Sequence, residues 1–264
     1  MSLISTRGGS AVTASQAILH GLAPNGGLYV PGMLPAFSLQ EIASFSSQSY
    51  AQRATRVLSS LLDDFSSAEV AQCVQAAYHT GHFDAAEIAP VKTLRPGLHV
   101  LELFHGPTLA FKDMALQILP HLMHLAAQKC GETREVLILV ATSGDTGKAA
   151  LEGFADVPGT RCAVFYPKDG VSSAQRLQMI TQAGENTHVV AVLGNFDDAQ
   201  TGVKRLFSDG NFQGYMHAQG RVLSSANSIN FGRLAPQVAY YFSAYADLLQ
   251  RGEVTLGAPV HFVH

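Results

Sequence analysis

The sequence predicts an α/β protein: a parallel sheet with helices on both faces, preceded by a mainly helical N-terminal region. From about residue 97 onward, short apolar runs alternate with amphipathic stretches, which is the pattern of repeated strand–helix units. The apolar runs are nearly continuous, as in strands buried on both faces of a parallel sheet. Before that point, Gly- and Pro-rich turns separate helix-like segments. Together these features indicate three layers, helix–sheet–helix, in the second part of the chain.

The N-terminal region is expected to form a domain of its own over residues 1–94. Ser38, followed three residues later by Glu41, is the pattern of a capped helix start. Residues 28–30 carry the strongest strand signal of this region. Apolar spacing predicts helices over residues 38–45, 50–63 and 67–79.

The second region is expected to form the sheet within residues 95–264. Its predicted strands are residues 98–103, 135–141, 161–166, 188–193, 222–225 and 260–263. Its predicted helices are residues 113–129, 145–154, 172–182, 197–207 and 229–250. Pro120 should kink the first of these helices. Sheets of this kind bind ligands at the carboxyl ends of their strands, so the loops at those ends are the places to look for chemistry.

Composition limits the class of protein. With 264 residues, of which 47% are hydrophobic and 14% charged, the chain is long and apolar enough for a sizeable core. A net charge of −3 without a Lys/Arg stripe argues against a nucleic-acid partner. The apolar runs are too short to span a membrane. Three cysteines without CxxC spacing are typical of a reducing compartment, so we expect a soluble cytoplasmic protein.

The first notable loop comes before the helix predicted to start at Asp113. Lys112 falls beside that helix start, where the helix dipole disfavours a cation, and the apolar Leu109, Ala110 and Phe111 come just before it. If these neighbours bury the side chain, they favour the free amine that an imine-forming lysine needs. A surface lysine paired with Asp113 is the alternative.

The second loop, residues 142–148, follows a continuous apolar strand. Gly144 and Gly147 let the backbone approach a ligand closely, and the first N–H groups of the helix, with three hydroxyls, form an anion cradle. A capped helix start without a ligand is the alternative. A Walker A phosphate loop is excluded, because it needs a glycine where Thr142 stands and a hydroxyl where Ala149 stands.

The third loop follows the predicted strand at residues 222–225. Asn227 and Ser228 offer uncharged donors there, and Arg233, in the first turns of the next helix, could hold a phosphate or carboxylate with two N–H groups. Turn chemistry and a solvated arginine are the alternative. Because the three loops belong to one edge of the sheet, together they predict a lysine between two anion sites.

Histidines do not indicate a metal site. The eleven histidines are scattered along the chain, and His121 and His124 lie three residues apart on a predicted helix. No carboxylate shares that face, and we therefore expect no bound metal.

Five segments closely resemble threonine synthase, a pyridoxal phosphate (PLP) enzyme with the tryptophan-synthase-β-like fold, also called fold type II. They match in order and spacing over essentially the whole chain, and the stretch from His105 to Asp113 is the most specific. The Gly-Gly-Leu-Tyr-Val-Pro block after Asn25 is similar to the longer branch of that family, which has a distinct N-terminal domain. The segments are residues 4–9, 25–31, 104–113, 141–147 and 227–233.

The resemblance implies a reaction and a set of site residues. Lys112 would hold PLP as a Schiff base, and Asp145 would lie beside the cofactor. The residues implied for substrate binding are Thr142, Ser143, Asp145, Thr146, Asn227, Ser228 and Arg233. The implied reaction converts O-phospho-L-homoserine and water to L-threonine and phosphate, the last step of threonine biosynthesis. The enzyme would be a cytoplasmic lyase and a monomer or homodimer.

The resemblance also leaves alternatives open. Members of that branch are longer, and the loop expected to cradle the PLP phosphate would follow the strand at residues 260–263. The chain therefore looks like the N-terminal part of an enzyme. A phospho-lyase on the same scaffold, releasing phosphate and a 2-oxo acid, is an alternative reaction. A truncated chain that binds ligands without catalysis is a further alternative.

Overall fold

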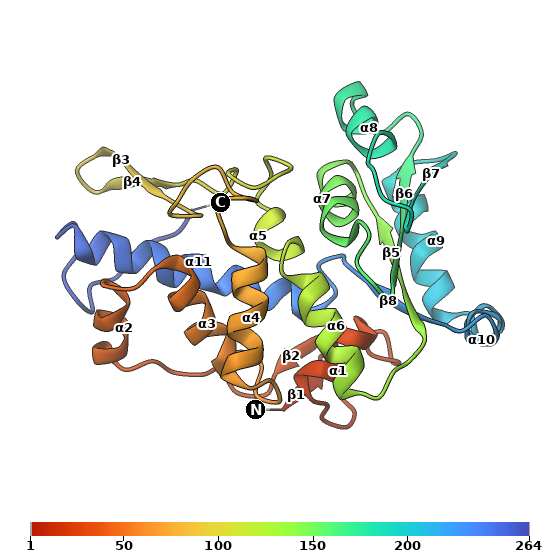
Figure 1. Ribbon diagram of the computed structural model, residues 1–264, viewed down its shortest axis with the longest axis horizontal. Helices are drawn as coiled ribbons and strands as arrows, with labels where there is room; N and C mark the ends of the chain where they lie inside the picture. The colour runs from red at the N-terminus through yellow and green to blue at the C-terminus, as the bar shows by residue number, and fades with distance from the viewer. Residues whose placement is uncertain (1, 264) are drawn as a thin grey trace.

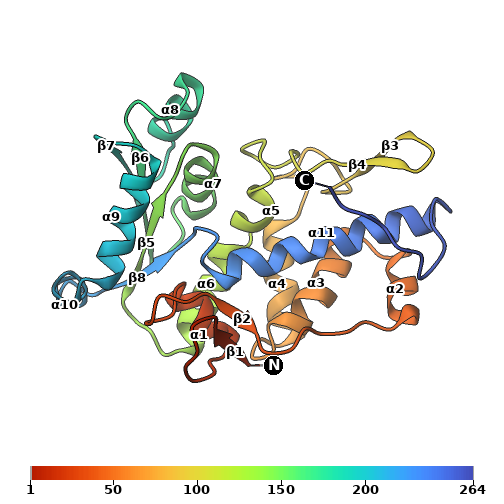
Figure 2. The ribbon, with the colours of Figure 1, turned by 180° about the vertical axis from the view of Figure 1, so that it is seen from behind.

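The N-terminal part of the protein is mainly helical. The computed structural model describes residues 2–263 (Figures 1 and 2). Strands β1 (Leu3–Ser5) and β2 (Tyr29–Pro31) pair antiparallel beside helix α1 (Ala14–His20). The following helices are α2 (Leu39–Phe45), α3 (Tyr50–Leu61) and α4 (Ser67–Ala77). The helices predicted in this region are therefore confirmed, and α1 is an additional one.

Capping boxes set the starts of these four helices. In each, a hydroxyl side chain accepts the N–H of the third helical residue, whose own side chain accepts the N–H of the capping residue. The pairs are Thr13 with Gln16, Ser38 with Glu41, Ser49 with Gln52, and Ser66 with Glu69. The Ser38–Glu41 pattern read from the sequence is confirmed.

The main sheet has four parallel strands in the order β7–β6–β5–β8. The strands are β5 (Glu135–Ala141), β6 (Thr160–Pro167), β7 (Thr187–Val192) and β8 (Arg221–Ser225). Alternate residues of β5 face opposite cores: Ile138 packs in the cluster that contains α7 (Asp145–Phe154), whereas Leu139 packs in the cluster that contains α9 (Phe196–Ser208). Figure 1 shows the sheet between these two helices. The predicted helix–sheet–helix layering is confirmed.

Two further helices complete the surroundings of the sheet. Helix α8 (Ser173–Ile180) follows the carboxyl end of β6 and packs against α7. Helix α10 (Gly210–Ala218) packs against β8 and was not expected, because its polar sequence has little apolar periodicity. Asp209 caps this helix by accepting the N–H groups of Asn211 and Phe212.

One long helix joins the sheet to the N-terminal helices. Helix α11 (Phe231–Gln250) starts after β8 and runs along α3 and α2 (Figure 2). Arg53 of α3 is buried against it and forms an ion pair with Asp247 at 2.6 Å. Arg53 also donates to the carbonyl of Phe45. A single hydrophobic cluster contains both Leu58 of α3 and Ile138 of β5, so the domain boundary near residue 94 stays a prediction.

Two predicted strands are not part of the parallel sheet. Residues 98–101 form β4 (Leu98–Leu101), which pairs antiparallel with β3 (Val91–Arg95) in a hairpin. Leu98 and Val100 are exposed while Leu101 packs on the core, which is the alternation of an antiparallel strand with one wet face. Residues 260–263 form no strand. Phe262 instead packs edge-on against Tyr241 of α11, with ring centroids 4.8 Å apart.

The helix predicted over residues 113–129 is broken in two. A short α5 (Asp113–Leu116) is followed by α6 (Leu119–Lys129). Pro120 lies in the first turn of α6, where its missing N–H costs no helical hydrogen bond. The proline therefore marks a new helix start instead of the kink expected inside one helix.

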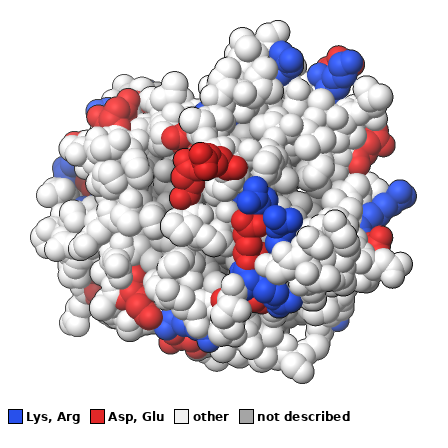
Figure 3. All heavy atoms as spheres, turned by 45° about the vertical axis from the view of Figure 1, so that its right-hand side comes forward, with Lys and Arg blue, Asp and Glu red and all other residues white. Residues whose placement is uncertain are grey.

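Two features are absent from the part of the chain that the structure describes. Across residues 2–263, no helix combines the length and the apolar character needed to cross a membrane. Within the same residues, no three His, Cys, Asp or Glu side chains gather in an arrangement that could hold a metal ion. On the face drawn in Figure 3, the charged side chains lie in small scattered groups, and near the centre basic and acidic side chains adjoin one another.

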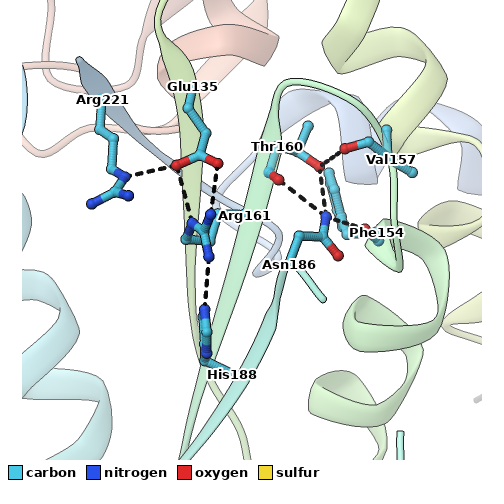
Figure 4. A network of polar contacts seen from close by, with 8 residues as sticks. All are labelled: Glu135, Phe154, Val157, Thr160, Arg161, Asn186, His188 and Arg221. Carbon is cyan, nitrogen blue, oxygen red and sulfur yellow. Dashed lines mark hydrogen bonds and ion pairs between the residues drawn. The ribbon is translucent and has the colours of Figure 1, made fainter. Parts of the chain in front are cut away.

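A polar network holds the amino ends of the strands (Figure 4). Glu135, the first residue of β5, accepts hydrogen bonds from Arg161 Nε at 3.0 Å and from Arg221 Nε at 2.7 Å. Arg161 also contacts His188 of β7, with Nη1 and Nε2 3.0 Å apart. The network therefore links all four strands at the edge opposite to their carboxyl ends.

Replacing Glu135 with glutamine is expected to destabilise the protein in a pH-dependent way. The variant leaves two arginines around a neutral amide, which should lower the free energy of unfolding by about 1 kcal/mol at neutral pH. Arg161, and then Arg221, hold the pKa of Glu135 below its usual value. A carboxylate with a lowered pKa stabilises the fold above its unfolded-state pKa, and that contribution is lost as the pH falls through the folded-state value. Urea unfolding at neutral and acidic pH should show a difference that shrinks in acid, and an equal difference at both would contradict this.

Candidate active site

The structure brings the three loops singled out in the sequence together at the carboxyl edge of the sheet. Lys112 of the first loop reaches Asp145 of the second, with Nζ and Oδ2 3.1 Å apart. Arg233, after the third loop, reaches Thr146 of the second, with Nη2 and Oγ1 3.4 Å apart. The second loop, which starts α7, is therefore the centre of the site.

The first loop closes around a buried carboxylate. Asp113 has no exposed surface, and it accepts the N–H of Thr108 at 2.8 Å and its hydroxyl at 2.7 Å. Burial raises the pKa of Asp113, although the Thr108 hydrogen bonds act in the opposite direction. Gly106 is needed beside it, because a Cβ there would lie 2.5 Å from the Cβ of Asp113. Asp113 thus supports the loop, and Lys112 pairs with Asp145 instead.

Lys112 is partly accessible to solvent beside the start of α7. Its side chain is 19% exposed, and its Nζ lies 4.4 Å from the ring centroid of Phe111. The lysine is therefore partly buried, with Phe111 against its amine, although Leu109 and Phe111 are themselves exposed. The helix beside it, α5, has only four residues. Contact with Asp145 is what positions the amine.

His105 fastens the first loop to the chain before it. Its Nδ1 lies 2.6 Å from Asp84 Oδ1, and its Nε2 lies 3.0 Å from Glu102 Oε2. Burial lowers the pKa of His105, but the hydrogen bonds with Glu102 and Asp84 outweigh it, so the pKa is raised overall. These contacts therefore stabilise the loop most while the ring is protonated, and less as the pH rises through that raised value.

In the second loop, Thr142 serves the loop itself. It is buried, and its Oγ1 accepts the N–H groups of Gly144 at 2.9 Å and Gly147 at 2.8 Å. Gly144 has a φ of 142°, a conformation that favours glycine. Ser143 is exposed, and Asp145, the first residue of α7, has a side chain that is 46% exposed. Ser143 and Asp145 are therefore the open positions of this turn.

One residue at this loop was not predicted from the sequence. Gln175 of α8 donates from Nε2 to Asp145 Oδ1 at 2.9 Å. Gln175, and then Lys112, hold the pKa of Asp145 below its usual value. The only local signal was the spacing of Ser172 and Gln175, which marks a capped helix start and says nothing about a contact with Asp145.

In the third loop, the two asparagines have structural partners. Asn227 accepts the N–H of Ala141 at 3.1 Å and donates to its carbonyl at 2.8 Å, so its whole amide is bound to the end of β5. Asn230, also missed in the sequence, caps α11 and donates to the carbonyls of Ile18 and Ser225. Ser228 is exposed between them.

Arg233 is a buried cation that forms no ion pair with another side chain of residues 2–263. The residue is 4% exposed, and its Nη1 donates to the carbonyl of Ala226 at 2.8 Å. Its Nε has no hydrogen-bond partner within residues 2–263. Burial lowers the pKa of Arg233 to about 10. A solvated arginine is therefore excluded, and the guanidinium is suited to an anion that would restore the missing hydrogen bonds.

Comparison with known proteins identifies the family. Residues 89–246, more than half of the chain, match the family described as pyridoxal-phosphate dependent enzyme. The chain belongs to this family. Residues 2–78 match the region described as threonine synthase N terminus. Both matches agree with the resemblance noted in the sequence.

Individual members of the pyridoxal-phosphate dependent enzyme family are similar along most of this chain. Threonine synthase from Pseudomonas aeruginosa is 43% identical over 250 residues, which cover 94% of this chain and 51% of that protein. Human threonine synthase-like 1 is 42% identical over 261 residues, which cover 95% of this chain and 34% of that protein. The chain thus spans about half the length of the first of these curated relatives and about a third of the second.

Solved structures confirm the fold. PLP-bound threonine synthase from Brucella melitensis matches with a TM-score of 0.83 and 39% identity, covering 94% of this chain and 52% of that one. Threonine synthase from Escherichia coli matches with a TM-score of 0.81 and 33% identity, covering 98% and 62%. The expected fold type II architecture is therefore confirmed.

The residues present fit PLP, the cofactor of this family, at its aldehyde end. Lys112 supplies an accessible primary amine, the group that binds PLP covalently in its enzymes. The amine lies at the start of α7, where the Gly144 turn leaves no space for a larger residue because a Cβ would lie 2.4 Å from the Gln175 amide. The guanidinium of Arg233, whose Nε has no partner within residues 2–263, is a cation nearby that could bind an anionic group of the substrate.

Proposed function

We propose that the protein acts as a threonine synthase, converting O-phospho-L-homoserine and water to L-threonine and phosphate. One observation carries the proposal. Two consecutive residues at the start of α7 contact the two groups that the reaction needs: Asp145 contacts the Lys112 amine, and Thr146 contacts the buried guanidinium of Arg233. An amine and a phosphate-binding cation are thus held on one helix start, as a substrate with an amino acid end and a phosphate end requires.

Lys112 has two tasks in this proposal. It would hold the cofactor, and when released it would take the proton from the substrate α-carbon at its Nζ. PLP, when bound, withdraws electrons from that carbon and so makes the proton removable. Asp145 would keep Nζ directed at the site, as its 3.1 Å contact with Lys112 suggests.

The remaining predicted residues would bind the substrate. Arg233 and Thr146, with Ser228, would hold the phosphate and stabilise the charge that develops as it leaves. Ser143 and the first N–H groups of α7 would bind the carboxylate. Thr142 and Asn227 would contribute by shaping the loops, since their polar groups are engaged with Gly144, Gly147 and Ala141.

The division into domains is part of the same proposal. Residues 1–94 would form the N-terminal domain and residues 95–264 the catalytic region. The two family matches, over residues 2–78 and 89–246, support a division between them. The cytoplasmic location and the monomer or homodimer state stay predictions.

Product analysis tests the proposed reaction. The purified chain is incubated with PLP and O-phospho-L-homoserine, and phosphate, threonine and 2-oxo acids are measured. Threonine and phosphate in equal amounts are expected. Phosphate with a 2-oxo acid would instead indicate a phospho-lyase, and no product together with an intact PLP adduct at Lys112 would indicate a ligand-binding chain without this activity.

A further inference from the structure

Gln175 and Lys112 divide the two oxygens of Asp145 between them. Gln175 Nε2 donates to Oδ1 at 2.9 Å, and Lys112 Nζ lies 3.1 Å from Oδ2. Turning the carboxylate away from Gln175 would therefore also change its approach to Lys112. The direction of the Asp145 side chain is set by a residue of α8 that lies outside the three loops.

The amide of Gln175 has only one favourable direction. Its Oε1 accepts the N–H of Ser172 at 3.1 Å in the capping box of α8, which leaves Nε2 to face Asp145. If the amide were reversed, an NH₂ group would face the N–H of Ser172, and a carbonyl oxygen would face a carboxylate. Both contacts would then be repulsive. The capping box therefore fixes the orientation of the amide, with its NH₂ group donating to Asp145.

Close packing holds this amide in place. A Cβ on Gly144 would lie 2.4 Å from Gln175 Cδ and 2.4 Å from its Nε2. The amide therefore lies directly against the backbone of the loop that starts α7. Helix α8 has one buried residue of its own, Met179, so its attachment to the site depends strongly on polar contacts such as this one.

We propose that Gln175 is a positioning residue, which aims the Asp145 carboxylate at Lys112 and thereby sets how readily Lys112 takes its cofactor. Its catalytic meaning rests on the proposed function, whereas the contact itself rests on the geometry described above. Gln175 acts through Asp145.

The test is the variant Gln175→Glu. Glutamate has nearly the same shape and is an ordinary capping-box residue, so it keeps the oxygen that accepts the Ser172 N–H. It replaces the donor facing Asp145 with a second carboxylate oxygen. The PLP concentration that half-saturates a borohydride-reducible adduct at Lys112 should rise about tenfold. In protein labelled with ¹³C-aspartate, the Asp145 carboxyl should titrate at a higher pH than in the wild type, with its signal assigned from Asp145→Asn.

Two control variants separate positioning from helix capping. Gln52→Glu makes the same change in the capping box of α3, where Gln52 accepts the N–H of Ser49 and is exposed. It should leave both measurements unchanged. Ser172→Ala removes the capping hydroxyl of α8 but keeps the Gln175 donor, and it too should leave the Asp145 titration unchanged. If Gln175→Glu does not fold by circular dichroism, Gln175→Leu removes the donor without adding a charge.

The outcomes are distinguishable. The proposal is overturned if Gln175→Glu behaves like Gln52→Glu in both measurements, or if Ser172→Ala shifts the Asp145 titration as much as Gln175→Glu does. If the wild-type chain forms no adduct at Lys112, the proposed function fails. The Asp145 titration still decides whether Gln175 positions that carboxylate.

Discussion

Replacing Lys112 with alanine is expected to abolish the covalent PLP adduct and all activity that depends on it. Lys112 is the one lysine that the structure places against the start of α7 from the first loop, with Nζ 3.1 Å from Asp145 Oδ2. Alanine has no amine, and no rearrangement of the loop replaces it. Visible absorption with added PLP, followed by borohydride reduction and peptide mapping, should find the adduct at Lys112 in the wild type and none in the variant.

Lys148 provides the matched control for this experiment. It lies on α7, at the end of the second loop, and its side chain is 17% exposed, compared with 19% for Lys112. Its Nζ contacts Glu152 at 2.9 Å, away from the site. Lys148→Ala should keep the adduct. An adduct that persists in Lys112→Ala and maps to another lysine would remove Lys112 from the proposed role.

Replacing Arg233 with methionine should lower activity while leaving stability nearly unchanged. Loss of a charged hydrogen bond to the substrate phosphate should lower kcat/KM by about tenfold to a hundredfold. The free energy of unfolding without ligand should change little. Methionine fills a similar volume, and removal of a buried cation whose Nε has no partner within residues 2–263 offsets the loss of the hydrogen bond to the Ala226 carbonyl. The lowered pKa of Arg233, about 10, reflects the same cost of burial.

Kinetics and thermal unfolding check this pair of effects. Inorganic phosphate should raise the Tm of the wild type more than that of Arg233→Met, since a ligand that binds only the native state stabilises it. Arg221→Met is the control, because Arg221 lies at the amino edge of the sheet beside Glu135. It should leave kcat/KM unchanged. Unchanged kinetics in Arg233→Met would remove Arg233 from the site.

Local patterns in the sequence were sufficient for the elements that build the sheet. The strand over residues 135–141 and the helix over residues 145–154 have the predicted bounds, because a continuous apolar run and a helix start are local signals. The strand predicted over residues 98–103 was wrongly placed in the parallel sheet: β4 pairs with β3 in a hairpin, and a short apolar run does not reveal which strand will be its partner. The break before α6 was not predicted, because Pro120 was placed inside a helix, whereas it lies in the first turn of a new one.

For the candidate site, the sequence predicted which loops form it, but it did not predict which contacts their side chains make. Lys112 and Asp145 are 33 residues apart, and Gln175 is 30 residues beyond Asp145, so their contacts depend on tertiary packing. Spacing alone could not show that the polar groups of Thr142 and Asn227 form hydrogen bonds with the backbone. The burial of Arg233 likewise follows from the packing of α11.

The ion pair between Arg53 and Asp247 restricts how the protein can be recombined with its relatives. Arg53 lies in the segment that matches one family, residues 2–78, and Asp247 lies one residue past the segment that matches the other, residues 89–246, on the helix that continues from it. The helix that carries Asp247 also carries Arg233 at its other end. A chimera that exchanges the N-terminal segment alone must therefore bring its own partner for Asp247, or it leaves a largely buried charge uncompensated on the helix that holds the proposed phosphate-binding arginine. The N-terminal segment and this helix therefore have to be exchanged together, or with the Arg53–Asp247 pair kept.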